Sequence, residues 1–212
     1  MKNIILIFIL FFCKQLFAED LEITKWFNQE SQQFLEIMNN TGVNVSDFNK
    51  YEKFVSQNFA LKSIAYGLIN EKIIENNDQE TLLEYQKTFK KYLIKTIYNL
   101  ANTSTSGEIT LKDIDLKDKV YIINSDIADG KSSISLYWKV VKINDSYKII
   151  DVIVENTSYF VTKKSEFTKI LRKNRGNLKK LIKNLKEFQL KIFFGGPGRT
   201  RTCDNGVMST AF

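Results

Sequence analysis

Residues that commonly carry out catalysis are scarce in this chain. Its 212 residues include no histidine, and its two cysteines, Cys13 and Cys203, lie near the two ends. This composition excludes serine–histidine and cysteine–histidine catalysis and the usual zinc and copper sites. The chain also contains no glycine-rich phosphate loop. An enzyme would have to rely on isolated carboxylates or hydroxyls, so we expect a protein that is not an enzyme and that holds no metal or cofactor.

Acidic residues are the remaining candidates for acid–base catalysis or calcium binding. Asp126 and Asp129 could pair in principle, but Asp129 precedes Gly130, and this dipeptide is typical of a tight hairpin turn. The spacing of an EF-hand is absent. Three further aspartates alternate with apolar residues, as in an edge strand that faces water: Asp113, Asp115 and Asp118. We therefore predict structural roles for these carboxylates.

Both ends of the chain differ in composition from the part between them. Residues 1–18 contain Lys2, a nine-residue apolar run and the tripeptide Leu16-Phe17-Ala18, which is typical of a cleaved secretory signal peptide. The run is shorter than the ~20 apolar residues that span a membrane, and an uncleaved anchor is the alternative. Residues 193–212 hold the only proline and show no apolar period. We interpret them as a disordered or artefactual tail, with a flexible basic tail as the alternative.

The part in between, residues 19–192, is predicted to be one α+β domain. Up to residue 100 the apolar residues recur every three or four positions, which indicates helices, the longest at about 79–100. From Gly107 the period changes to two, which indicates strands. Four strands are predicted at residues 109–114, 120–127, 132–143 and 147–155. Two further helices follow, so we expect helices wrapped around one four-stranded antiparallel sheet.

Residues 135–190 carry motifs in an order that resembles a known family. Two strands meet at the turn pair Asn144-Asp145, and the second strand is followed by two helices. This order, together with residues 51–70, resembles the MlaC (toluene-tolerance) family of periplasmic phospholipid-binding proteins over roughly residues 30–190. The matching residues are Tyr137, Val140, Lys148, Asp151, Val152, Val154, Glu155, Ser158, Phe167, Leu181, Ile182 and Leu185, with Phe59, Ala65 and Gly67 upstream.

Four positions depart from the family pattern. Tyr147 stands where the family usually has tryptophan, Asn156 where it has glycine, Lys164 where it has arginine, and Ala60 where it has aspartate. We expect Asn156 to take over any turn that requires a positive φ, since asparagine tolerates that conformation better than most residues.

The resemblance implies an apolar cavity between the sheet and the helices that holds acyl chains. Periodicity alone does not separate such a cavity from a filled core. With the resemblance, we predict that the lining residues are Phe59, Ile64, Leu68, Phe89, Tyr92, Leu93, Leu136, Trp138, Val140, Val152 and Val154.

Charge is distributed unevenly along the chain. Residues 163–191 contain eleven basic side chains and only two acidic ones. We predict that four lysines form a docking face for an anionic membrane or an acidic partner: Lys179, Lys180, Lys183 and Lys186. Apolar residues at helical spacing, among them Leu178 and Leu185, would hold this helix to the body. A solvated lysine face is the alternative, and nucleic acid is not expected because no nucleic-acid motif accompanies the charge.

Two functions remain open from the sequence. By resemblance, the protein is a monomeric periplasmic phospholipid carrier that shuttles lipid between an outer-membrane lipoprotein complex and an inner-membrane ABC transporter complex, and so maintains outer-membrane asymmetry. The alternative is a secreted interaction module of nuclear-transport-factor-like shape, with a packed core and no ligand.

Overall fold

The computed structural model describes the backbone of residues 2–39, 45–103, 107–128 and 133–194, and the side chains of residues 21–39, 48–99, 107–128 and 133–188. Two compact units make up the chain. The first contains residues Met1–Phe59 and Ala101–Asn156, and the second contains Ala60–Leu100 and Thr157–Phe212. The predicted tail lies outside the described residues from residue 195 onward.

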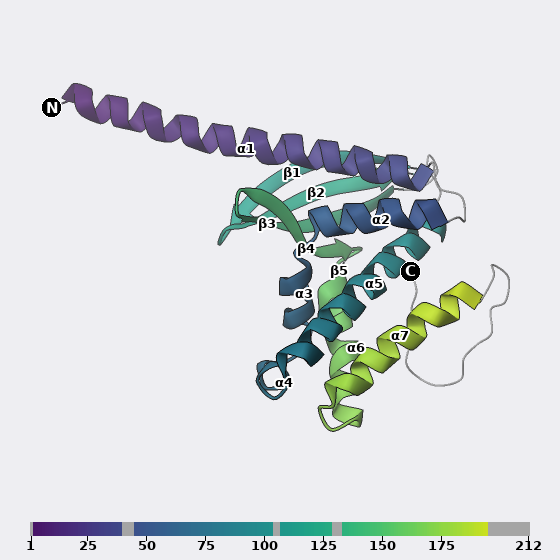
Figure 1. Ribbon diagram of the computed structural model, residues 1–212. Coiled ribbons are helices and arrows are strands. Elements are labelled where there is room, and N and C mark those ends of the chain that lie inside the picture. Colours follow the sequence, from purple (N-terminus) through teal and green to yellow (C-terminus); the bar gives the residue numbers. More distant parts are fainter. Residues whose placement is uncertain (1, 40–44, 104–106, 129–132, 195–212) are drawn as a thin grey trace. The chain divides into compact units, whose positions relative to one another are not determined.

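An antiparallel sheet and two helices form the first unit (Figure 1). The helices are α1 (Lys2–Asn39) and α2 (Val45–Asn58). The strands are β1 (Glu108–Lys117), β2 (Val120–Ala128), β3 (Ser133–Ile143) and β4 (Ser146–Val154). Each of these strands pairs antiparallel with the next, as their alternating sequence predicts.

A fifth strand, β5 (Thr157–Ser158), completes the sheet in the order β1-β2-β3-β4-β5. The prediction of a four-stranded sheet is therefore wrong in its number of strands. The reason is length, because two residues carry no alternation of apolar and polar side chains. The α+β class and the single antiparallel sheet are confirmed.

Tight turns connect β1 to β2, β3 to β4 and β4 to β5. Asn144 and Asp145 both have positive φ, 47° and 58°, which is the geometry of the hairpin turn predicted for this pair. Asn156 has φ 66°, so the asparagine adopts the conformation expected of it in place of glycine. Asp118, with φ 50°, lies in the turn after β1 and not in the strand itself, and it is exposed. The predicted turn at Asp129-Gly130 lies outside the described residues.

The core of the first unit lies between α1 and one face of the sheet. Ile23 and Phe27 of α1 are buried against alternating side chains of the strands. Buried partners on the sheet are Tyr121, Ile123, Val140, Tyr147 and Ile149. The alternation in β2 and β4 therefore places one apolar set on the helix-covered face, as the period of two requires.

Five helices form the second unit: α3 (Leu61–Gly67), α4 (Glu71–Glu75), α5 (Gln79–Thr103, most of it in this unit), α6 (Tyr159–Lys173) and α7 (Leu178–Phe194). Polar side chains cap the starts of α5, α6 and α7, and Asn70 caps α4 in the same way. Asp78 Oδ1 accepts from Thr81 N at 2.7 Å, Ser158 Oγ from Val161 N at 3.0 Å, and Asn177 Oδ1 from Lys180 N at 3.2 Å. Such caps satisfy backbone donors that a helix start leaves unpaired.

Close packing within the second unit explains why one of the family residues, Gly67, is a glycine. A Cβ at Gly67, the last residue of α3, would lie 2.9 Å from the ring of Phe160 on α6. Glycine therefore lets α3 and α6 approach closely at this point. Within the described ranges, no helix combines the length and apolar character needed to cross a membrane.

Candidate functional site

In the first unit, the predicted lining residues of β3 face the helices. Leu136 and Val140 are buried, and Trp138 is half-buried. Trp138 and Val140 line an apolar cavity of about 20 Å³. Its other walls come from α1, α2 and β4: Trp26, Phe27, Glu30, Ser31, Phe34, Phe54 and Ile149. This volume matches one water molecule, whereas sites for drug-sized ligands measure roughly 300–1,000 Å³.

Aromatic side chains form most of the wall of this cavity. The Phe27 ring meets the Trp138 ring edge-on, with centroids 6.0 Å apart, and Phe34 stacks on Phe54 at 5.2 Å. Trp138 Nε1 donates to Ser125 Oγ at 2.9 Å, which satisfies a polar pair on an otherwise apolar face. A single rotamer thus serves both the hydrogen bond and the ring contact, so Trp138 is held in place from two sides.

The remaining sheet-side residues of the prediction belong to the same unit. Val152 packs against the core cluster, and Val154 is half-buried at the end of β4. Phe59 follows α2 and pairs through its backbone with Ile149 of β4. The structure therefore brings Phe59, Trp138, Val140 and Val152 to one apolar region of the first unit.

The helix-side residues of the prediction lie in the core of the second unit. All are buried: Ile64, Leu68, Phe89, Tyr92 and Leu93. The Phe89 ring lies 6.4 Å from Phe167, and the Tyr92 ring lies 6.0 Å from the same side chain. Phe167, one of the family residues, thus holds α6 against α5. The proposed lining role of the eleven residues stays a prediction, because they divide between two units.

A polar cluster beside this core escaped sequence analysis. Lys163 Nζ donates to both carboxylate oxygens of Glu166, at 2.9 and 3.1 Å, and lies 5.5 Å from the centre of the Tyr159 ring. Burial would lower the pKa of Lys163, but Tyr92 and Glu166 raise it above its usual value. Burial raises the pKa of Tyr159 far above its usual range. Both groups therefore keep their protons at neutral pH, which does not suit them to act as general bases.

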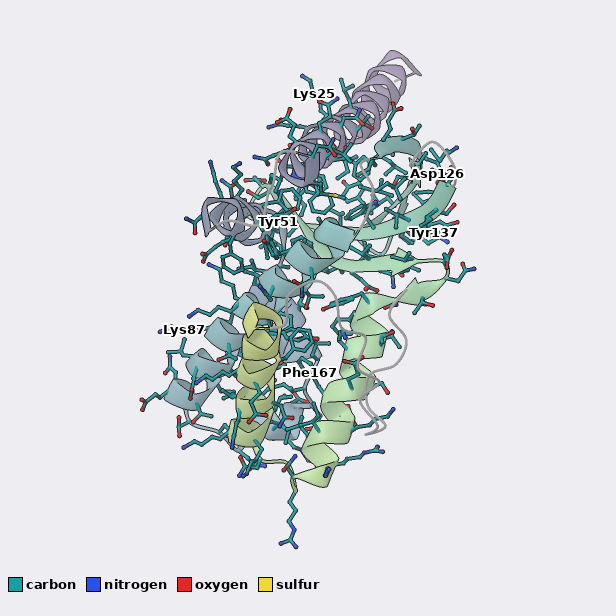
Figure 2. The ribbon with its side chains drawn as sticks, turned by 90° about the vertical axis from the view of Figure 1, so that its right-hand side faces the viewer. Lys25, Tyr51, Lys87, Asp126, Tyr137 and Phe167 are labelled. Carbon is teal, nitrogen blue, oxygen red and sulfur yellow. The ribbon has the colours of Figure 1, made fainter. Side chains whose placement is uncertain are left out.

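Asp126 is already engaged by its neighbours. Its carboxylate accepts from Ser135 Oγ at 3.0 Å and pairs with Lys112 Nζ at 2.9 Å. These contacts, the one with Lys112 first, lower the pKa of Asp126. The register pairs Asp126 with Ser135, so its carboxylate lies on the same face of the sheet as Tyr137, two residues further along β3; Figure 2 labels both residues. Among the described residues, no three side chains of the metal-binding types lie together.

The predicted basic face of α7 has the expected amphipathic arrangement. Leu178, Leu181, Ile182 and Leu185 are buried, while Lys179, Lys180, Lys183 and Lys186 are exposed. Two of these lysines have acidic partners: Lys186 Nζ lies 2.6 Å from Glu84, and Lys183 Nζ lies 3.8 Å from Glu187. The packing side is confirmed, and the docking role stays a prediction.

A comparison with protein families decides which family the chain represents. The family model described as MlaC protein matches residues 28–187. The chain belongs to the MlaC family. The resemblance seen in the sequence is thereby confirmed.

One solved structure similar to this MlaC-family chain is a phospholipid-binding protein from Ralstonia solanacearum, solved in complex with a phospholipid. The two share a TM-score of 0.65 and 17% sequence identity, over 82% of this chain and 98% of the other. This likeness supports a common fold. No curated protein matches the chain.

Proposed function

We propose that this MlaC-family protein is a periplasmic phospholipid carrier. The observation that carries the proposal is the family match, which extends over residues 28–187 and so over both units. The likeness in fold to a protein solved with a bound phospholipid supports it. In this proposal the chain is not an enzyme and is exported through a cleaved signal peptide.

The physical task of such a carrier is to hide acyl chains from water. Each exposed CH₂ group costs about 0.8 kcal/mol, so a two-chain phospholipid with roughly thirty such groups meets a barrier on the order of 20 kcal/mol in an aqueous gap. Burial of the chains removes this barrier without any catalytic residue. A chain that lacks histidine is compatible with this task.

The lipid requires an apolar cavity, and the eleven residues named from the sequence stay the prediction for its lining. The cavity at Trp138 and Val140 measures only about 20 Å³, so acyl chains would have to displace the aromatic side chains around it. In the carrier cycle, the lipid would pass between an outer-membrane lipoprotein complex and an inner-membrane ABC transporter complex, with the monomer moving between them.

Lipid extraction tests the proposal directly. The exported protein is purified without detergent, extracted with organic solvent and analysed by mass spectrometry. We expect phospholipid to co-purify in an amount comparable to the protein. A stable, folded monomer that contains no lipid, and that takes up none from vesicles, would contradict the carrier and favour an interaction module with a packed core.

A further inference from the structure

The turn between α6 and α7 collects positive charge. Five exposed basic residues lie within nine positions of the chain, at the end of α6, in the turn and at the start of α7: Arg172, Lys173, Arg175, Lys179 and Lys180. We call this set the α6–α7 turn surface. It overlaps only in part with the lysine face that the sequence predicted.

These five side chains differ from three other lysines of the two helices in their ion pairing. Lys163, Lys183 and Lys186 each pair with a glutamate. Within the described residues, no ion pair within 4.0 Å involves any member of the α6–α7 turn surface. Lys179 contributes to lowering the pKa of Asp78, but this carboxylate is already occupied as the cap of α5. Among the described residues, therefore, no ion pair neutralises the charges of the turn surface.

A well-defined backbone presents these charges. Helix α6 is capped by Asn174, whose side chain donates to Ile170 O at 2.7 Å, and Gly176 N donates to Leu171 O at 2.8 Å. Arg175 and Gly176 both have positive φ, 53° and 77°, which reverses the chain within three residues. A Cβ at Gly176 would lie 3.1 Å from Ile73 Cδ1, so the turn lies against α4.

A favourable interaction with a helix dipole explains the position of only some of these basic residues. Arg172 and Lys173 lie in the last turn of α6, where the helix dipole favours cations. Lys179 and Lys180 lie in the first turn of α7, which contains no acidic residue. Cations at that end are unfavourable for the helix. Interaction with the helix dipole therefore does not account for these two lysines.

We propose that the α6–α7 turn surface docks the protein to an anionic phospholipid leaflet, an inference that rests on the proposed carrier function. Protein interfaces have cores enriched in aromatic residues and arginine and depleted in lysine, and three of the five residues here are lysines. In the described part of the chain, the large apolar side chains that are exposed lie outside residues 169–180. A surface of unpaired cations without apolar anchors fits lipid phosphates, because attraction to an anionic leaflet requires only proximity and charge.

The test compares vesicle binding by the purified full chain and two charge-matched variants. The turn variant carries Arg172→Gln, Lys173→Gln and Arg175→Gln. The control variant carries Lys62→Gln, Lys87→Gln and Lys91→Gln, three exposed lysines on α3 and α5 of the same unit; Figure 2 shows Lys87 on α5. Both variants lose the same net charge. Co-sedimentation is measured with vesicles of phosphatidylcholine alone and of phosphatidylcholine mixed equally with phosphatidylglycerol, at low and at high salt.

We expect the unaltered chain and the control variant to bind the anionic vesicles similarly, and to be released by salt. Each basic residue near an anionic leaflet contributes roughly fivefold in affinity, so the turn variant should bind about 100-fold more weakly.

Equal losses of binding in both variants would overturn the proposal, because net charge alone would then explain the binding. Absence of binding by the unaltered chain would also overturn it and leave an acidic protein as the partner. The lipid content of the turn variant distinguishes the two proposals. If the variant co-purifies with phospholipid but binds vesicles weakly, only docking is impaired and the carrier function is intact.

Discussion

At the scale of single residues, two tyrosine hydroxyls of the second unit differ in their hydrogen bonding. Tyr85 Oη donates to the carbonyl oxygen of Ala65 at 2.8 Å. The hydroxyl of Tyr159 is buried and makes no hydrogen bond of normal geometry with the described residues, although Thr96 and Tyr92 lie near enough to influence its pKa. A buried polar group without a partner costs about 1–3 kcal/mol, so Tyr159 contributes less to stability than its packing would allow.

Replacement of Tyr159 by phenylalanine should therefore stabilise the protein. We expect Tyr159→Phe to raise the free energy of unfolding by about 1 kcal/mol, which corresponds to a rise in Tm of about 2–4 °C for a chain of this size. Thermal and denaturant unfolding measure the change. The matched control is Tyr85→Phe, which removes a satisfied hydroxyl and should lower stability by about 1 kcal/mol. Destabilisation by both substitutions would show that Tyr159 has a partner, such as buried water.

Trp138 offers a residue-level test of the lipid site. Successive side chains of a strand point to opposite faces, so Trp138 and Tyr137 sample the two sides of β3. Trp138 belongs to the helix-covered face. We expect a photo-crosslinking amino acid at position 138 to attach to bound phospholipid, and the same group at position 137 to attach to none. Mass spectrometry of the irradiated protein identifies the adducts, and attachment from Tyr137 alone would reverse the assignment of the faces.

The sequence was informative for some residues because a local rule decides their conformation. Asn156 could be assigned a positive φ since asparagine is among the few residues that tolerate it. The cluster of Tyr159, Lys163 and Glu166 could not be predicted. Its geometry depends on how α6 packs on α5, and the spacing of Lys163 and Glu166 alone is typical of many exposed helical pairs.

At the scale of elements, the turn between α6 and α7 depends on two residues with positive φ. A side chain in this conformation costs roughly 1–2 kcal/mol. Gly176→Ala should therefore lower the free energy of unfolding by about 1–2 kcal/mol, and the added Cβ would also press on Ile73 Cδ1 at 3.1 Å. Urea unfolding measures the loss.

Arg175→Gly is the matched control for this turn. It places glycine at φ 53°, which relieves the left-handed conformation but adds freedom to the unfolded chain. We expect stability to stay the same or to rise by up to about 1 kcal/mol. If both substitutions lower the free energy of unfolding to the same extent, the cost of positive φ does not determine the stability of this turn.

Long elements were predictable because they repeat their pattern several times. Helix α5 and the four long strands have clear periods, and their observed bounds differ from the predicted ones by a few residues. Helix α4, with five residues, and strand β5, with two, were missed. An element shorter than two turns of helix or two alternations of strand carries no period that a sequence could reveal.

At the scale of the whole molecule, the sequence reports which side of an element is apolar but not which element covers it. The residues predicted to line one cavity divide between two units, each with its own core. Leu136 and Phe89, for example, have equally strong patterns, yet one is buried in the sheet unit and the other among the helices. Tertiary packing, and not local periodicity, makes this division.

Maturation of the chain is also a property of the whole molecule. We expect cleavage after Ala18, so that intact-mass analysis of the exported protein finds a chain that begins at Glu19. Among the residues whose side chains are described, α1 contacts the sheet from Glu22 and Ile23 onward: Ile23 is fully buried, and Glu22 Oε2 accepts from Lys142 Nζ at 2.8 Å and from Tyr147 Oη at 3.2 Å. Removal of residues 1–18 should therefore leave Tm unchanged relative to the uncleaved chain, measured side by side. A mature species that retains Met1, or one that carries lipid on Cys13, would refute the cleaved signal peptide, and a large fall in Tm on removal would assign residues 1–18 to the fold.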